Sequence, residues 1–217
     1  MMIGQASMKI HFLINRFLLT FVFLNIESLH IKLPINDQFW SIVPNLNQLR
    51  SLTLSSYADI YQSQLQTLLD QAHHLNQLDI NQDTLLPLHM SIIKYTNASI
   101  CQLDLISYNH CFNEDESITL TISLLGLQCE VLSIWNNNRQ IINVIKNMPN
   151  LRALNVKYVD KNYYKQLALT TNKDDEFCDD EEELNTNELI QCLKVHLPST
   201  HLMTNDTYYI DGISIWI

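Results

Sequence analysis

Leu151-Arg152-Ala153-Leu154-Asn155-Val156, directly after Met148-Pro149-Asn150, is the stretch that decides the fold. Its apolar residues stand at the first, fourth and sixth positions, and the same spacing recurs along the chain. Internal repeats are examined first because they determine the architecture of the whole protein. The seven copies are Ile26/Leu29/Ile31, Leu49/Leu52/Leu54, Leu75/Leu78/Ile80, Ile100/Leu103/Leu105, Cys129/Leu132/Ile134, Leu151/Leu154/Val156 and Ile210/Ile213/Ile215.

The copies and the segments between them predict units of one strand and one helix. Successive copies start 23, 26, 25, 29 and 22 residues apart, and the last starts 59 residues after its predecessor. Alternation of apolar and polar residues within a copy is typical of a strand. Between copies, Leu65, Leu68, Leu69 and Ala72 form one helical face behind Ser63 as the expected cap. Further helices are expected at residues 37–43, capped by Asn36 or Asp37, and at 86–95, 118–125, 141–148 and 189–197, with a helix favoured over a strand at 118–125.

Such units must stack, because one unit cannot bury its own apolar side. Stacking predicts parallel strands on an inner face and helices on an outer face. We therefore expect an α/β fold, a single solenoid domain over residues 1–217 that curves as a horseshoe.

The pattern resembles the leucine-rich-repeat family over about residues 26–217. The first five spacings lie within the roughly 20–29 residues of that family's repeats. The segments Met148-Pro149-Asn150-Leu151-Arg152-Ala153-Leu154 and Pro44-Asn45-Leu46-Asn47-Gln48-Leu49-Arg50-Ser51-Leu52 look like the irregular repeats that follow an F-box. In that family the repeats hold a substrate protein, while the F-box docks on the adaptor of a cullin-type ubiquitin ligase.

The resemblance implies a non-catalytic, leucine-rich-repeat-like scaffold that binds a protein partner, as substrate-recognition repeats do. Leu33-Pro34 begins like an F-box but lacks the rest of the pattern, so ligase components would be reached through a longer parent chain. The family's consensus asparagine would fall at Tyr57, Asp83, Tyr108, Asn137 and Val159, and it matches at Asn137. The alternative is a general adaptor or inhibitor with no ubiquitin link.

The composition excludes several classes of function. The net charge is −10, but eight of the 23 acidic residues lie in residues 174–183. The rest of the chain has 15 acidic and 13 basic residues and is therefore nearly neutral. Nucleic-acid binding needs clustered Lys and Arg, so it is not expected. Three glycines are too few for a phosphate-binding loop, and no cofactor is expected. Five cysteines without a CxxC pair indicate a reduced, cytoplasmic chain.

Two segments lie outside the repeat pattern. Residues 10–26 are apolar but are interrupted by His11, Asn15 and Arg16, whereas a membrane span needs about 20 nearly uncharged residues. We expect a buried helix or strand there, with a targeting segment as the alternative, and no membrane partner. Residues 170–185 contain the acidic run, which should stay solvated, so a disordered insertion is predicted.

Candidate partner-binding residues follow from the strand period, since residues that alternate with the buried leucines face the open side. Most of these positions are small or polar. Trp135, Trp216 and Ile106 are the exceptions, and aromatic anchors dominate protein–protein interfaces. Asn155 and Lys157 are expected between the two tryptophans, in the centre of the binding surface. The alternative is that loops of the same chain cover each tryptophan.

Asp79 and Asp104 occupy equivalent positions in successive strands. Parallel strands lie about 4.8 Å apart, so the two carboxylates should be neighbours. Such a pair can perform acid–base chemistry, but with no nucleophile or base assigned nearby we expect a basic ligand that contacts both. The histidines match no zinc spacing, so no metal site and no catalytic residues are predicted.

Overall fold

The computed structural model describes most of the chain from residue 25 to residue 157 and shorter pieces on either side. The described residues are 10–11, 25–55, 61–81, 94–106, 112, 114–135, 141–157, 190–191, 193–195, 202–205 and 212–217. The predicted acidic insertion at 170–185 lies outside these ranges, as do residues 86–93 of the helix expected at 86–95 and residues 12–24 of the apolar amino-terminal segment.

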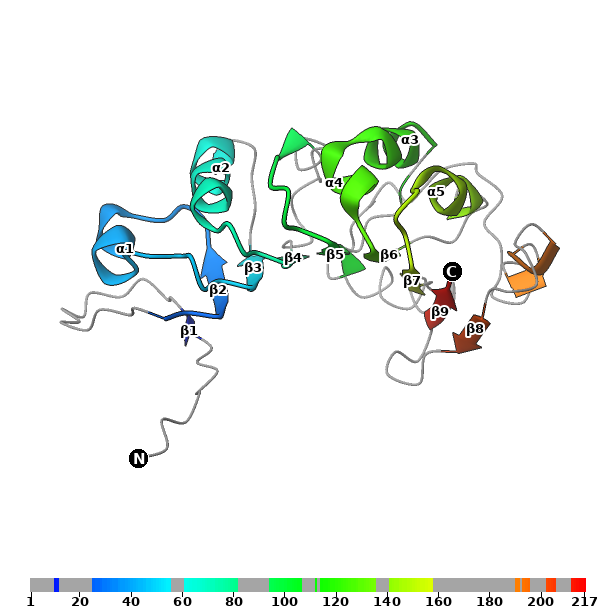
Figure 1. The fold of residues 1–217 in the computed structure, drawn as a ribbon, viewed down its shortest axis with the longest axis horizontal. Coiled ribbons are helices and arrows are strands. Elements are labelled where there is room, and N and C mark those ends of the chain that lie inside the picture. Colours follow the sequence, from blue (N-terminus) through cyan, green and yellow to red (C-terminus); the bar gives the residue numbers. More distant parts are fainter. Residues whose placement is uncertain are drawn as a thin grey trace, which may run out of the picture.

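A nine-stranded sheet runs through the described part of the chain, with helices on one side (Figure 1). Its order is β1-β2-β3-β4-β5-β6-β7-β9-β8, so the first seven strands follow one another in both sequence and space. This mostly parallel sheet with helices confirms the expected α/β class. The strands are β1 Ile10–His11, β2 Ser28–Lys32, β3 Ser51–Ser55, β4 Gln77–Asn81, β5 Gln102–Asp104, β6 Val131–Trp135, β7 Ala153–Lys157, β8 Leu202–Asn205 and β9 Gly212–Trp216.

The consensus leucines of the repeat lie side by side in the sheet. Strands β1 to β7 pair in parallel, and the register aligns the middle apolar residue of each copy with the next. All members of this row are at most 3% exposed, so the pattern read from the sequence is the core of the protein. The row consists of Leu29, Leu52, Leu78, Leu103, Leu132 and Leu154.

The backbone repeats the same hydrogen bonds at the start of each strand from β3 to β7. The carbonyl of the residue that precedes one strand accepts two N–H groups from the next unit; Glu27, for example, accepts from Arg50 and Ser51 at 2.8 and 3.0 Å. Arg50, Asn76, Cys101 and Glu130 accept in the same way. Each unit therefore fixes the register of its successor through backbone groups.

A tight turn leads into each of these strands. The N–H of the first apolar residue of a copy donates to the carbonyl three residues earlier, as in Leu49 to Leu46 and Leu151 to Met148. Leu46 thus begins its turn, whereas Leu151 ends one. The two Pro-Asn-Leu sequences, at 44–46 and 149–151, therefore occupy different positions in their units.

Helices α1 (Asp37–Ile42), α2 (Gln62–Gln71) and α5 (Ile141–Asn147) use the apolar faces expected from sequence. Asn36 caps α1, since its Oδ1 accepts the Phe39 N–H at 3.1 Å. Ser63 does not cap α2, which begins one residue before it and has no side-chain cap. The predicted face of α2 is nevertheless buried, because the spacing of its leucines decides which side meets the sheet.

The sequence pattern of residues 118–125 fits both a helix and a strand, with a helix favoured. The structure has two helices there, α3 (Glu114–Ile122) and α4 (Leu124–Gln128). Ser123 joins the two helices: its Oγ donates to the Leu120 carbonyl at 2.7 Å and accepts the Gly126 N–H at 3.0 Å. A Cβ at Gly126 would overlap the Leu120 carbonyl oxygen, so the close approach of α4 to α3 requires glycine there.

The last repeat copy runs in the opposite direction from the prediction. Strand β9 pairs with β7 antiparallel, so Ile213 lies beside Val156 and Ile215 beside Leu154. Both isoleucines are buried, as the repeat pattern requires, but the stacked parallel strand expected at Ile210–Ile217 is wrong. An alternating pattern reads the same in both chain directions. It therefore predicts which side of a strand is buried, but not whether the strand runs parallel or antiparallel to its neighbour.

Leu154→Ala should lower the free energy of unfolding by about 2–5 kcal/mol, because the residue is fully buried and the substitution leaves a cavity in the leucine row. Equilibrium urea unfolding measures the change. Arg152→Ala, two residues away on a side chain that is 75% exposed, is the matched control and should cost about 0.5 kcal/mol or less. Equal losses for the two variants would contradict the assigned core.

Candidate functional site

The face of the sheet opposite the helices carries the residues that alternate with the buried leucines (Figure 1). Because the strands are in register, equivalent side chains from successive strands form rows across this inner face. The middle row is polar throughout its described side chains. It consists of His30, Thr53, Asp79, Asp104, Ser133, Asn155 and Ser214.

Asp79 and Asp104 lie at the centre of this row, directly paired between β4 and β5 as predicted. Thr53 Oγ1 donates to Asp79 Oδ2 at 3.4 Å. Asp79 Oδ1 is buried and has no hydrogen-bond partner among the described residues. Burial, and secondly the charge of Asp104, raise the pKa of Asp79 from 3.8 to about 6, while the Thr53 hydrogen bond lowers it.

Asp104 ends its strand and turns the backbone. Its Oδ1 accepts the Ile106 N–H at 2.9 Å, an Asx-type turn. Burial raises the pKa of Asp104, whereas this hydrogen bond stabilises the charged form and lowers it. Burial outweighs this hydrogen bond, so the pKa of Asp104, like that of Asp79, is raised above its ordinary value.

Ile106 is buried, which leaves little of its side chain exposed for the predicted role as a contact residue. The strand expected over residues 100–106 ends at Asp104, and Ile106, which follows the Asp104 turn, is 6% exposed. Strand alternation does not apply beyond the turn, so the side of the sheet on which Ile106 lies does not follow from the sequence pattern.

Beyond the acidic pair, the middle row continues as a chain of hydrogen bonds. Asn155 Nδ2 donates to Ser133 Oγ at 3.1 Å, and Ser214 Oγ donates to Asn155 Oδ1 at 2.9 Å. The predicted site residue Asn155 is thus held between two serines from neighbouring strands. These two hydrogen bonds fix the orientation of its amide.

Each predicted tryptophan is the last residue of its strand, but β6 and β9 run in opposite directions, so the two tryptophans lie beside opposite ends of β7. The register places Trp135 beside Lys157 and Trp216 beside Ala153. Trp216 is 54% exposed, so it is available to a partner, whereas the side chain of Trp135 lies outside the described part of the structure. Strand β7, which carries Asn155 and Lys157, lies between the strands of the two tryptophans as expected, but the antiparallel β9 places Trp216 at the other end of β7 from Lys157.

The inner face also holds a contact that the sequence analysis missed. His30 Nε2 and Ser55 Oγ are 2.6 Å apart, on the neighbouring strands β2 and β3. His30 occupies the same repeat position as Thr53 and Asp79. None of the predicted contact residues lies in the first copy, although strand alternation applied to that copy would have placed this histidine on the inner face.

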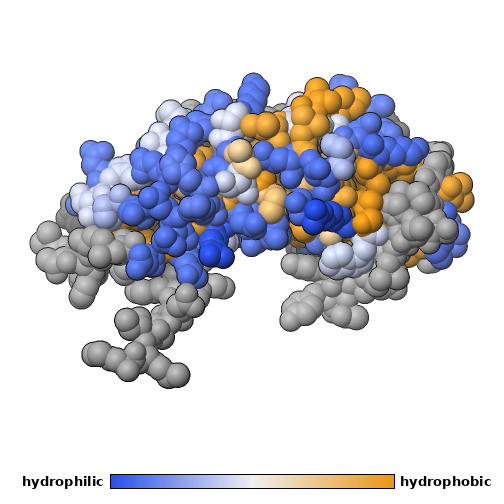
Figure 2. Space-filling view, viewed as in Figure 1, coloured by the Kyte–Doolittle hydropathy of each residue, from blue (hydrophilic) through white to orange (hydrophobic). Residues whose placement is uncertain are grey.

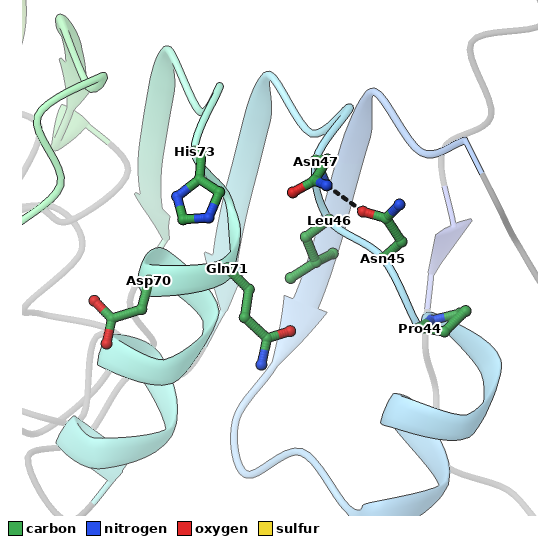
Figure 3. Close-up of a pocket in the computed structure, with 7 residues that line it drawn as sticks. All are labelled: Pro44, Asn45, Leu46, Asn47, Asp70, Gln71 and His73. Carbon is green, nitrogen blue, oxygen red and sulfur yellow. Dashed lines mark hydrogen bonds between the residues drawn. The ribbon is translucent and has the colours of Figure 1, made fainter.

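A hollow outside the inner face lies between the loop after α1 and the end of α2 (Figure 3). It has a volume of about 320 Å³ and is lined mostly by polar residues. Asn45 Oδ1 accepts the Asn47 N–H at 2.7 Å, and Asp70 points away from these asparagines. Its polar groups do not converge on one point, so the inner face remains the stronger candidate.

The described residues contain no group of three or more potential metal ligands. Likewise, none of the helices within the described ranges is long and apolar enough to cross a membrane. Burial raises the pKa of Cys129 to about 12, which leaves its thiol protonated and hence a poor nucleophile. Comparison of the sequence with protein-family models and with curated proteins gives no match.

Stability should depend on pH through Asp79. Its folded-state pKa of about 6 exceeds the ordinary 3.8, so between these values the folded protein binds more protons than the unfolded chain. The free energy of unfolding therefore falls as pH rises through this range. Relative to the wild type, Asp79→Asn should gain about 1 kcal/mol at neutral pH, a value reduced for partial exposure, and nothing near pH 4.

Urea unfolding of both proteins from pH 4 to pH 8 gives this difference directly. Asp70→Asn, which removes a carboxyl from the exposed surface of α2, is the matched control. A constant difference between wild type and Asp79→Asn across the range would show that Asp79 has no raised pKa.

Proposed function

We propose that this chain is a non-catalytic protein-interaction scaffold, a leucine-rich-repeat-like solenoid that binds a partner on its inner face. The recurring turn, strand and backbone hydrogen bonds support repetition of a single structural unit. Solenoids of this kind use a sheet lined with polar side chains as an extended binding surface. The described inner face is lined in this way by its middle row.

The observation that carries the proposal is the in-register pair Asp79–Asp104, with the buried and unpartnered Oδ1 of Asp79. Two adjacent carboxylates in a partly buried site repel each other, which is unfavourable in the free protein. A Lys or Arg side chain of a partner, placed between them, would offset this repulsion and form charge-assisted hydrogen bonds. We infer that the centre of the inner face binds a basic side chain.

The surroundings of the pair suit a protein ligand. Asn155 offers an oriented amide, and Trp216 an exposed aromatic ring, at other points of the same face. Aromatic residues enriched at interfaces supply apolar contact area, while a charged pair gives specificity. A partner that spans this face would thus place a cationic side chain near the acidic pair and an apolar group near Trp216.

A peptide array tests the proposal. The intact chain is incubated with immobilised peptides that present Arg or Lys at the central position, and with the same peptides carrying citrulline or norleucine there. The wild type should favour the cationic peptides by about tenfold. Asp79→Asn combined with Asp104→Asn should lose this preference, whereas Asp37→Asn combined with Asp70→Asn, an equal charge change on the helices, should keep it.

A wild-type protein without preference for the cationic peptides would contradict the proposed site. If the wild type showed an enzymatic activity that Asp79→Asn combined with Asp104→Asn abolished while the fold stayed intact, the pair would instead be assigned to acid–base catalysis.

The narrower version of the proposal is a substrate receptor of a cullin-type ubiquitin ligase, for which the resemblance to repeats that follow an F-box is the support. Affinity capture with the natural full-length protein from native lysate should retain cullin-ligase components under this version. Capture of partners without any ligase component would support the general adaptor or inhibitor instead.

A further inference from the structure

Helix α3 buries polar side chains and exposes apolar ones. Ser117 and Thr121 are buried beside Leu120, whereas Ile118 and Ile122 are 43% and 68% exposed. In α2 and α5 the buried residues are all Leu, Ile or Val. Burial of isoleucine side chains stabilises a protein, so the fold of the free chain leaves part of this stabilisation unused.

The apolar surface continues onto α4. Leu124 and Leu127 are 45% and 42% exposed and lie three residues apart, on one helix face. Four of the seven exposed large apolar residues in the described part of the chain thus fall within ten residues. Figure 2 shows apolar side chains gathered over α3 and α4. Single exposed apolar residues are ordinary, but a cluster of them marks an interaction surface.

We call Ile118, Ile122, Leu124 and Leu127 the α3–α4 patch. Ser123 holds its two halves together through its hydrogen bonds to Leu120 and Gly126. The patch is therefore formed before a partner binds, which reduces the entropy lost on association.

One end of the patch is acidic. Glu114 and Asp115 are exposed in the first turn of α3, four and three residues before Ile118. Residues at these spacings share one face of a helix. The surface therefore runs from negative charge at the start of α3 to apolar side chains at its end and on α4.

We propose that the α3–α4 patch is a docking surface for an amphipathic helix of a partner protein that carries Lys or Arg at one end. Apolar side chains of the partner at i, i+3, i+4 and i+7 would cover the isoleucines and leucines. Its basic end would meet Glu114 and Asp115 and fix the direction in which the helix lies.

The acidic end of the patch disfavours two other binding partners, a second copy of this chain and an anionic membrane. Two-fold pairing of two copies through this patch would give Glu114 and Asp115 no basic partner, because residues 114–128 contain no Lys or Arg. A membrane surface rich in anionic lipid would repel the acidic end. The patch lies on the helix side of the sheet, away from the acidic pair, so this proposal does not depend on the function of the inner face (Figure 1).

Fluorescence anisotropy with the intact chain tests the proposal. The probe is a labelled helical peptide with leucines at i, i+3, i+4 and i+7 and a lysine cluster at one end, and its control has glutamates in place of the lysines. The wild type should bind the lysine peptide about tenfold more tightly than the glutamate peptide. Ile118→Gln combined with Ile122→Gln should weaken binding of the lysine peptide by about tenfold.

Glu114→Lys combined with Asp115→Lys should reverse the preference between the two peptides. This variant keeps every apolar residue, so it decides the question even if the glutamine variant fails to fold, which circular dichroism would show. Gln62→Ala combined with Gln71→Ala, on exposed positions of α2, should leave binding unchanged.

Three results would overturn the proposal. One is no binding of the lysine peptide, or equal binding of the two peptides. Another is that sedimentation shows a concentration-dependent dimer of the wild type, and that Ile118→Gln combined with Ile122→Gln abolishes this dimer. The third is tighter binding to phosphatidylserine vesicles than to the lysine peptide.

Discussion

The in-register parallel pairing of strands β2 to β7 is the constraint on which the rest of the structure depends. It stacks one buried leucine of each unit on the next, from Leu29 to Leu154. A slip of one residue in any strand would turn its leucines to the inner face and its polar residues into the core, so burial specifies the register strongly. Carbonyl groups such as Glu27 and Arg50 reinforce the same register through the backbone.

The same constraint creates the candidate site. Once the leucines are aligned, residues at equivalent positions of the inner face are aligned as well, and Asp79 must lie beside Asp104. The raised pKa of Asp79 is thus a consequence of the register, together with the partial burial of the pair. The candidate site and the core packing are coupled here, since neither carboxylate can move away without disturbing the buried apolar residue on either side of it in the sequence.

Much of the architecture could be predicted because burial imposes a period on the sequence. The strands and the apolar faces of α2 and α5 followed from spacings of two and of three to four residues. Three features could not be found in this way. The direction of β9 cannot be predicted from an alternating pattern. The turn at Ile106 depends on one side-chain hydrogen bond. The isoleucines of α3 are exposed, against the expectation that apolar residues of a helix are buried.

A carbon-13 NMR titration of the Asp79 carboxyl group, in the wild type and in Asp104→Asn, tests the central claim most directly. If the register places the two carboxylates side by side in a partly buried site, Asp79 titrates with a pKa of about 6 in the wild type and at a lower pH when Asp104 is neutralised. An Asp79 pKa that stays near the ordinary 3.8 in both proteins would contradict the paired strands and the binding site built on them.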